Sequence, residues 1–176
     1  MREVTIIYGK TGTGKSFYTK KYIAGLNRVI IIDPMHEYSG AVFTTFEDLA
    51  NYFIEYEPDN FCCVCRFESD EEIEAVFNLC KIIKNLHLII EEAEIYISPY
   101  AKSSAFLDLC RYGRHQNISI IGIARRCSEL SINFRSLVTK IISFKQTEPK
   151  DLKIMQDLGF DNLDSLPEHQ YIEITP

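Results

Sequence analysis

An eight-residue stretch near the N-terminus, GKTGTGKS at residues 9–16, has the residue types and spacing that bind phosphate. It fits the pattern G-x-x-x-x-G-K-[ST] without a mismatch, after a β-prone apolar run and before a helix-forming run. Glycines let backbone N–H groups converge on an anion, and the following helix adds unpaired N–H groups. Lys15 can reach the β- and γ-phosphates, while the Ser16 hydroxyl can ligate Mg²⁺. We therefore expect a nucleoside triphosphate here, bound by Gly9, Lys10, Thr11, Gly12, Thr13, Gly14, Lys15, Ser16 and Phe17.

A second candidate for chemistry is the acidic end of an apolar run, LHLIIEE at residues 86–92. In P-loop ATPases such a strand brings one carboxylate to Mg²⁺ and a second to the attacking water. We expect Glu91 to take the metal role together with Ser16. We expect Glu92 to act as the base, because hydrolysis needs a carboxylate beyond the metal to orient water.

Positive charge is concentrated in residues 101–146, which contain eight Lys or Arg and two acids, although the whole chain has a formal net charge of -6. This asymmetry indicates a localised anionic partner. Cations at suitable spacing contact DNA phosphates without reading sequence, so such binding would be non-specific and salt-dependent. The alternative is that these charges balance the acidic remainder of the molecule. The candidates for a DNA-facing surface are Lys102, Arg125, Arg126, Arg135 and Lys140.

The elements that must position these groups follow from the hydrophobic pattern. Apolar, β-branched runs alternate with segments of helical period, which is typical of βαβ units and a mainly parallel sheet covered on both faces. Runs such as VIIID and LHLIIE are apolar at successive positions, as in strands buried on both sides. We expect strands near residues 3–8, 28–33, 61–67, 87–91, 118–124, 139–145 and 170–175, and helices near 15–25, 46–56, 70–84, 102–115 and 148–158.

Length and composition are those of one globular domain, which we expect to span residues 1–176. No apolar run approaches the roughly 20 residues that cross a bilayer. The charged N-terminal segment does not resemble a signal peptide, so we expect a cytoplasmic protein with no membrane partner. The six cysteines lack zinc-site spacing and are expected to be buried, reduced thiols.

Four stretches carry a family resemblance: GKTGTGKS, IIIDPMHEYSG, IIEEAE and RYGRHQNISIIGIARRCSEL. Together they resemble the HerA/FtsK superfamily of DNA-translocating ATPases, which includes packaging ATPases of tailless double-stranded DNA viruses. The first stretch is shared by many P-loop families. The second is similar to the second strand of HerA-type proteins, and the third to the double-glutamate Walker B motif of the HerA branch. The fourth resembles the arginine-bearing helix, the next strand and the sensor loop, so the likeness covers roughly residues 3–146.

The resemblance implies a RecA-like P-loop NTPase fold, a three-layer αβα sandwich around a central, mostly parallel sheet. It also implies an arginine finger that acts on the γ-phosphate of a neighbouring subunit, with Arg114 as first candidate and Arg111 as second. The family usually ends the sensor strand in Gln or Asn followed by Arg-Pro. This chain departs from that pattern with Arg125-Arg126-Cys127, so Arg125 stands at the sensor position.

The second of these stretches contains Asp33, Glu37 and Tyr38, whose roles the sequence leaves open. Asp33 would support the metal shell or the attacking water. Glu37 would do likewise or mediate a subunit contact. The alternative is a purely structural role for the three side chains.

The resemblance implies an ATP-hydrolysing translocase of double-stranded DNA, and the small size favours a viral genome-packaging motor subunit. Its partners would be DNA, other copies of the chain in a ring, and a capsid portal protein. Two alternatives stay open: a phage morphogenesis ATPase of the zonular-occludens-toxin type, and a small-molecule kinase of the nucleoside or shikimate type. A non-enzymatic, nucleotide-dependent switch is disfavoured by the intact Lys15 and Glu92.

Overall fold

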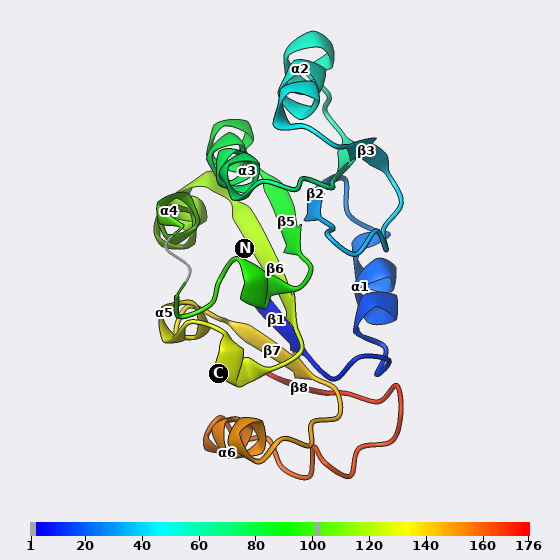
Figure 1. The fold of residues 1–176 in the computed structure, drawn as a ribbon, viewed down its shortest axis with the longest axis vertical. Helices are drawn as coiled ribbons and strands as arrows, with labels where there is room; N and C mark the ends of the chain where they lie inside the picture. Colours follow the sequence, from blue (N-terminus) through cyan, green and yellow to red (C-terminus); the bar gives the residue numbers. More distant parts are fainter. Residues whose placement is uncertain (1–2, 101–102) are drawn as a thin grey trace.

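One eight-stranded sheet forms the centre of the computed structural model, which describes residues 3–100 and 103–176 (Figure 1). The strands are β1 (Val4–Tyr8), β2 (Arg28–Ile32), β3 (Ala41–Phe43), β4 (Phe61–Cys65), β5 (Leu86–Ile90), β6 (Ile118–Ala124), β7 (Lys140–Ser143) and β8 (Ile172–Ile174). Their order is β3-β4-β2-β5-β6-β1-β7-β8. Among the strand pairs of the described residues, only β7–β8 is antiparallel. The predicted mostly parallel sheet is therefore confirmed.

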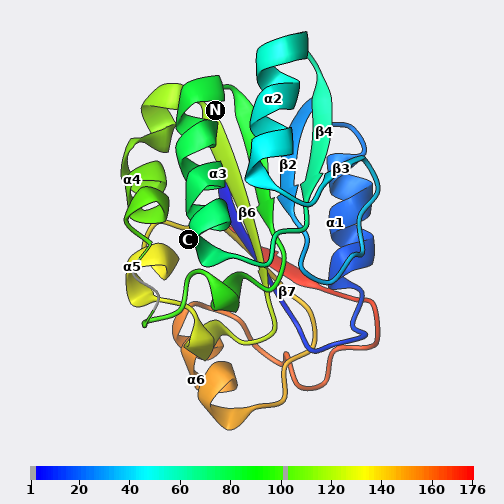
Figure 2. The ribbon, with the colours of Figure 1, turned by 45° about the horizontal axis from the view of Figure 1, so that its top comes forward.

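Helices cover both faces of the sheet, and this arrangement gives the three predicted layers (Figures 1 and 2). One face is covered by α1 (Lys15–Ile23), from which Tyr18 and Ile23 pack on buried strand residues. The other face is covered by α2 (Phe46–Tyr56), α3 (Asp70–Ile83), α4 (Ser104–Tyr112), α5 (Ile132–Arg135) and α6 (Pro149–Asp157). The described part of the chain contains no helix with the length and apolar character needed to cross a membrane.

Local sequence explains why these elements form where they do. All residues of β1 and β6 are buried, as expected for the central strands of a sheet covered on both faces. Side-chain oxygens accept first-turn N–H groups at the starts of three helices: Thr45 from Asp48, Ser69 from Glu72 and Ser103 from Phe106. Pro149 occupies the first turn of α6, where its missing N–H costs nothing.

Each predicted helix and strand is present, with ends that differ by at most three residues. The helix predicted at 102–115 is α4 followed by the 3-10 turn η2 (Gly113–Gln116), and residue 102 lies outside the described residues. Two 3-10 turns in the described residues, η1 (Ala93–Ile95) and η3 (Cys127–Glu129), were not predicted, and neither were the strand β3 and the helix α5. All four are too short, at three or four residues, to show a hydrophobic period.

The cysteines are all free thiols, and five of the six are buried. The expectation of burial is wrong for Cys62, because side chains alternate along β4 and this one lies toward the sheet edge on the face that α1 alone covers. Burial raises the pKa of Cys63 and Cys80 to about 12, so these thiols stay protonated.

The parallel strands bring the glycine loop and three of the other candidate residues to one end of the sheet, because their carboxyl ends all lie there. The glycine loop follows β1 and runs into α1. Glu91 follows β5, Arg125 follows β6 and Asp33 follows β2. Four segments that are far apart in the sequence therefore meet at a single end.

Candidate active site

The glycine loop between β1 and α1 has a backbone that needs glycine at two positions. Gly12 has φ of +82° and Gly14 has φ of +105°, both in the left-handed region. Gly9 is required for space, since a Cβ there would lie 2.6 Å from Thr13 Oγ1. The Thr13 backbone N–H and hydroxyl both donate to the Lys10 carbonyl oxygen, at 3.3 Å and 2.7 Å. These contacts close the loop into a tight turn.

A cavity of about 260 Å³ lies beside this loop, and Lys15 faces both predicted carboxylates there. Burial lowers the pKa of Lys15, and the charges of Glu91 and Glu92 act in the opposite direction. Its Nζ donates to the Lys10 carbonyl oxygen at 3.1 Å. The cavity is lined by Thr11, Gly12, Gly14, Lys15, Ser16, Phe17, Met35, Glu37, Glu91 and Glu92. The other three predicted loop contacts, Gly9, Lys10 and Thr13, do not line it but hold the shape of the loop.

Ser16 and Glu91, the two predicted Mg²⁺ ligands, are in contact. Ser16 Oγ donates to Glu91 Oε1 at 3.0 Å, and the Tyr38 hydroxyl donates to the same oxygen at 2.9 Å. Burial raises the pKa of Glu91, while these two hydrogen bonds partly offset the rise. Mg²⁺ is usually held by one or two protein oxygens together with water and substrate phosphates. A hydroxyl and a carboxylate at this spacing fit that requirement, and no cluster of three metal-ligating side chains occurs in the described residues.

Asp33 acts on this site through the segment that carries Tyr38. Its carboxylate is fully buried and accepts the backbone N–H groups of Glu37 and Tyr38 at 2.8 Å and 3.1 Å. Arg66 pairs with Asp33 at 3.1 Å and donates to the Tyr38 carbonyl oxygen at 2.8 Å. Asp33 therefore positions the tyrosine that holds Glu91, and Glu37 lines the cavity itself.

Glu92, the predicted base, has an unusual backbone. Its φ of +47° is in the left-handed region, which few non-glycine residues occupy. Strain of this kind costs on the order of 1–3 kcal/mol and clusters at functional sites. Burial and then the neighbouring Glu94 carboxylate raise the pKa of Glu92, while Arg125 and Lys15 oppose the rise.

Arg125 lies against Glu92, which places the predicted sensor residue at the predicted base. Its Nε is 3.1 Å from Glu92 Oε2 in an ion pair and donates its hydrogen to Glu94 Oε1 at 3.2 Å. The backbone N–H of Arg125 also donates to Glu94 Oε1, at 3.3 Å. Sequence reasoning missed Glu94, although three acids within the four residues EEAE were a visible signal.

Arg111 and Arg114 lie near the amino ends of the parallel strands, at the opposite end of the sheet from the glycine loop. Arg111 is in the last turn of α4, and Arg114 is in η2, just before the amino end of β6. Because β6 pairs in parallel with β1, this end is a strand length away from the loop. Both side chains are exposed. Within one chain neither arginine reaches the cavity, which is the arrangement that action on a neighbouring subunit requires.

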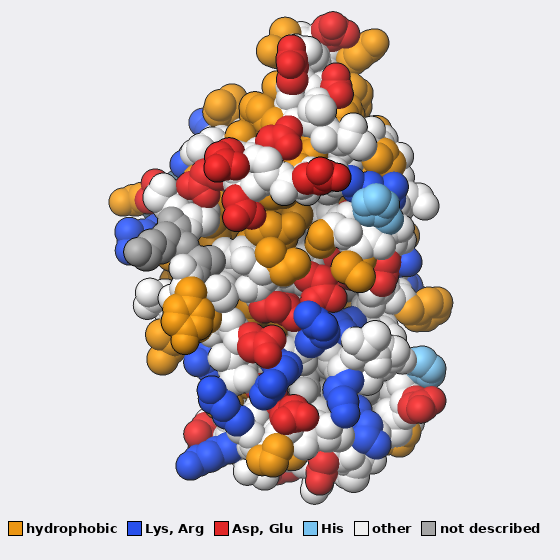
Figure 3. Space-filling model, viewed as in Figure 1, with side chains coloured by type: hydrophobic (Ala, Val, Ile, Leu, Met, Phe, Trp, Pro, Cys, Tyr) orange, Lys and Arg blue, Asp and Glu red, His pale blue; other side chains and the backbone are white. Residues whose placement is uncertain are grey.

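Three of the basic residues predicted to face DNA form ion pairs within the chain. In Figure 3, Lys and Arg gather over the lower half of the face, among acids, while acids cover the region of α2 and α3. The ion pairs are Arg126 with Asp151 at 2.8 Å, Lys140 with Glu173 at 2.9 Å, and Arg125 with Glu92 and Glu94. Charge balance therefore accounts for much of the predicted DNA-facing set, in which Lys102 lies outside the described residues.

These features define a RecA-like P-loop ATPase fold: a parallel sheet whose first strand enters a glycine loop, with paired acids at the end of a second strand. The model of the family described as the central domain of helicase HerA matches residues 5–140. The chain belongs to this family, and the resemblance to the HerA/FtsK superfamily is confirmed. No curated protein matches the chain in sequence.

Solved structures show the same fold at low sequence identity. The genome packaging NTPase B204 from Sulfolobus turreted icosahedral virus 2, in complex with AMP, gives a TM-score of 0.81 at 18% identity, over 99% of this chain and 92% of that chain. VirB4 of Thermoanaerobacter pseudethanolicus gives 0.60 at 15% identity, over 98% and 88%. The N-terminal domain of zonular occludens toxin from Neisseria meningitidis gives 0.55 at 18% identity, over 85% and 79%. The predicted fold class is thereby confirmed.

Proposed function

We propose that this chain is an Mg²⁺-dependent ATPase that translocates double-stranded DNA as the ring-forming subunit of a viral genome-packaging motor. The observation that carries the proposal is the convergence of Lys15, the Ser16–Glu91 pair and Glu92 on one cavity. Groups suited to phosphate, to a metal ion and to water thus share one site in a member of the HerA central-domain family.

Each of these side chains has a separate task in hydrolysis. Lys15 binds the β- and γ-phosphates of ATP, while Ser16 and Glu91 would hold Mg²⁺, which neutralises phosphate charge when bound. Glu92 orients the attacking water and accepts its proton. Its raised pKa suits this task, because a general base works best when its pKa lies closer to the working pH.

Arg125 is the proposed sensor of the γ-phosphate. Its guanidinium contacts Glu92, which lines the cavity, and is half exposed to solvent. A planar, permanently charged guanidinium can contact phosphate bidentately, which an amide in the sensor position cannot do. The sensor and the base are thereby linked through one ion pair.

The arginine finger comes from the next subunit, with Arg114 as first candidate and Arg111 as second. Their position at the far end of the sheet supports action in trans. An arginine supplied in this way stabilises charge on the transferred phosphoryl group and is worth about 10³- to 10⁵-fold in rate. Turnover therefore depends on assembly of the ring.

The packaging role draws its support from the likeness to B204, which is described as the DNA-packaging ATPase from Sulfolobus turreted icosahedral virus. The chain aligns with it over 98% of its own length. A motor of this kind binds duplex DNA through phosphates and docks on a capsid portal protein in the host cytoplasm. The DNA contacts would be non-specific and sensitive to salt.

The decisive experiment measures ATP hydrolysis with and without long duplex DNA at low and high salt, beside a screen for phosphorylated nucleosides. We expect stimulation by DNA that weakens as salt rises, and a larger particle on size-exclusion chromatography with DNA and an ATP analogue. A phosphorylated nucleoside would establish the kinase alternative instead. Hydrolysis that duplex DNA leaves unchanged would favour an ATPase of the zonular-occludens-toxin type.

A further inference from the structure

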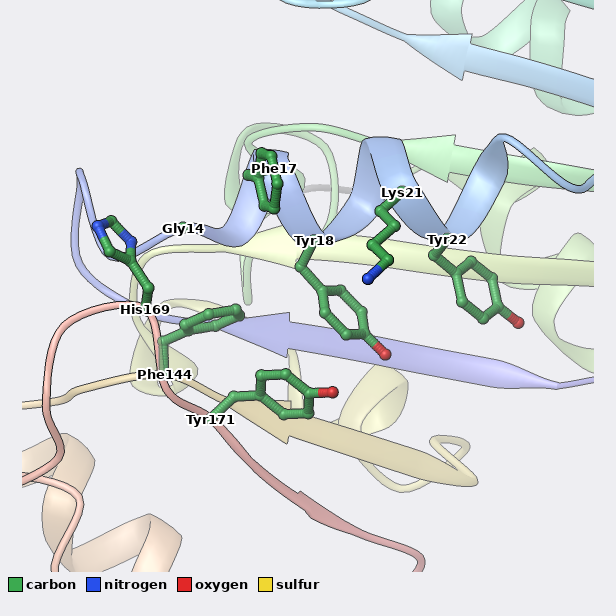
Figure 4. Close-up of a pocket in the computed structure, with 8 residues that line it drawn as sticks. All are labelled: Gly14, Phe17, Tyr18, Lys21, Tyr22, Phe144, His169 and Tyr171. Atoms are coloured by element: carbon green, nitrogen blue, oxygen red, sulfur yellow. The ribbon is translucent and has the colours of Figure 1, made fainter.

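A second, larger cavity of about 770 Å³ lies on the other side of the glycine loop, within the roughly 300–1,000 Å³ typical of small-molecule sites. Its walls come from α1 and from two segments near the C-terminus, the end of β7 and the approach to β8 (Figure 4). All of its lining residues except Gly14 and Lys21 carry a ring: Phe17, Tyr18, Tyr22, Phe144, His169 and Tyr171.

The rings form one packed group that still leaves ring surface accessible. Tyr18 meets Tyr171 edge-to-face with centroids 4.9 Å apart, and Phe144 lies 5.5 Å from Tyr171. Phe144 is buried, which fixes the floor of the cavity. Phe17 is 77% exposed and Tyr171 44% exposed, so each presents ring surface without a protein partner over it. In Figure 4, Phe17 projects from α1 and Tyr171 lies across the cavity from it.

The two cavities adjoin at the first turn of α1. Gly14 and Phe17 line both of them. A Cβ at Gly14 would lie 3.1 Å from His169 Nδ1, so the C-terminal segment closes directly over the glycine loop. A ligand whose phosphates lie in the small cavity would thus carry its remaining part past Gly14 into the aromatic one.

We propose that the aromatic cavity binds the base of the nucleotide by stacking, with Phe17 and Tyr171 as the principal ring contacts. This inference rests on the proposed ATPase function and adds the residues that hold the other end of the substrate. Stacking on aromatic side chains tolerates every base, because every base presents a π-face. The site therefore accepts ATP and GTP with affinities within about tenfold of each other.

The test compares two probes, ATP and inorganic tripolyphosphate, by isothermal titration calorimetry with Mg²⁺. Tripolyphosphate carries the phosphates without a base, so the difference between the two affinities isolates the aromatic cavity. We expect Phe17→Ala and Tyr171→Ala each to lower the affinity for ATP by about tenfold. The affinity of each variant for tripolyphosphate should stay within about twofold of the wild-type value. Tyr171→Phe, which keeps the ring, retains the wild-type affinity for ATP.

Tyr56→Ala is the matched control, because this exposed tyrosine lies on α2, on the opposite face of the sheet from α1. Phe17→Ala removes an exposed ring, so it decides the result if Tyr171→Ala does not fold. The stacking site would be overturned if the variants lost equal affinity for ATP and tripolyphosphate, or lost affinity for neither. It would also be overturned if the wild-type protein bound GTP more than about a hundredfold more weakly than ATP. If the wild-type protein binds neither probe, the proposed ATPase function fails as well. Failure of the stacking site alone would leave tripolyphosphate binding intact, so the two failures can be told apart.

Discussion

Glu92 occupies a strained, left-handed position between an arginine and a second acid. Substitution of this residue directly tests the proposed general base of ATP hydrolysis. We expect Glu92→Gln to lower ATP hydrolysis by about 10²- to 10⁴-fold, because a general base contributes a factor of this size. ATP affinity should stay near that of the wild type, since the variant keeps the shape of the side chain. Single-turnover hydrolysis and calorimetric ATP binding measure the two quantities.

The control for this variant is Glu55→Gln, which makes the same change on the exposed surface of α2. It should hydrolyse ATP at the wild-type rate. Near-normal hydrolysis by Glu92→Gln would show that another group orients the water.

The pH dependence of hydrolysis provides a second test at this scale, because the neighbours of Glu92 shift its pKa in opposite directions. The rate of hydrolysis should fall at acid pH as Glu92 is protonated. Because the pKa of Glu92 is raised, this acid limb of the pH–rate profile should lie above the ordinary value of 4.5. Glu94→Gln removes a repelling carboxylate and should move the limb to lower pH. Arg125→Ala removes an attracting cation and should move it to higher pH.

Profiles of kcat against pH for the three proteins check this expectation. A purely structural role for Glu94 and Arg125 would lower the rate without moving the limb in opposite directions.

Among the elements, α6 is joined to the turn after β6 by one buried carboxylate. Burial alone would raise the pKa of Asp151, but hydrogen bonds from Ser128 and Arg126 outweigh it and hold the pKa below the ordinary value. We expect Asp151→Asn to reduce the free energy of unfolding by about 1–3 kcal/mol, because it weakens charge-assisted hydrogen bonds in a buried position.

The same carboxylate predicts how this loss depends on pH. Its pKa is lower in the folded chain, so its contribution is present above the ordinary value of 3.8 and disappears as the pH falls through the folded pKa. The difference between wild type and Asp151→Asn should therefore shrink in acid, as measured by urea unfolding. Asp157→Asn, at the exposed end of α6, should show neither effect.

The sequence predicted the long elements well and the short ones poorly. Strands such as β5 and β6 are continuous apolar runs, and a glycine octet between strand and helix has few alternative structures. The three-residue β3 has no period to detect, and its pairing with β4 exists only in the folded sheet.

In the candidate site, too, local patterns predicted local features but not the contacts that form only in the folded chain. The contact between Ser16 and Glu91 was predictable because each stands in a local motif, and their metal-binding role stays a prediction. The contact of Tyr38 with Glu91 joins residues 53 positions apart, and the aromatic cavity joins α1 to residues 144–171. Such contacts arise only from tertiary packing, so no local pattern in the sequence predicts them.

For the whole molecule, the separation of Arg114 from the glycine loop predicts complementation between two inactive variants. Lys15→Ala should abolish ATP binding and Arg114→Ala should lower hydrolysis by about 10³-fold or more. Mixed in equal amounts, they should recover about a quarter of wild-type activity, because random assembly places an intact loop against an intact arginine at that frequency. Steady-state ATPase assays with DNA measure the recovery.

Each variant alone and each mixed with wild type serve as controls for assembly. If Arg114→Ala keeps full turnover, Arg114 is not the finger, and the same mixing experiment with Arg111→Ala examines the second candidate.

The shortness of β8 has a consequence for the timing of the reaction cycle. This strand pairs with β7 over only three residues at the sheet margin, and the segment just before it forms one wall of the aromatic cavity. Edge strands of this length fray more readily than central ones. With the base stacked in this cavity as proposed, we expect ADP to leave when the β7–β8 pairing opens, so that strengthening this pairing would slow the release of ADP after ATP hydrolysis.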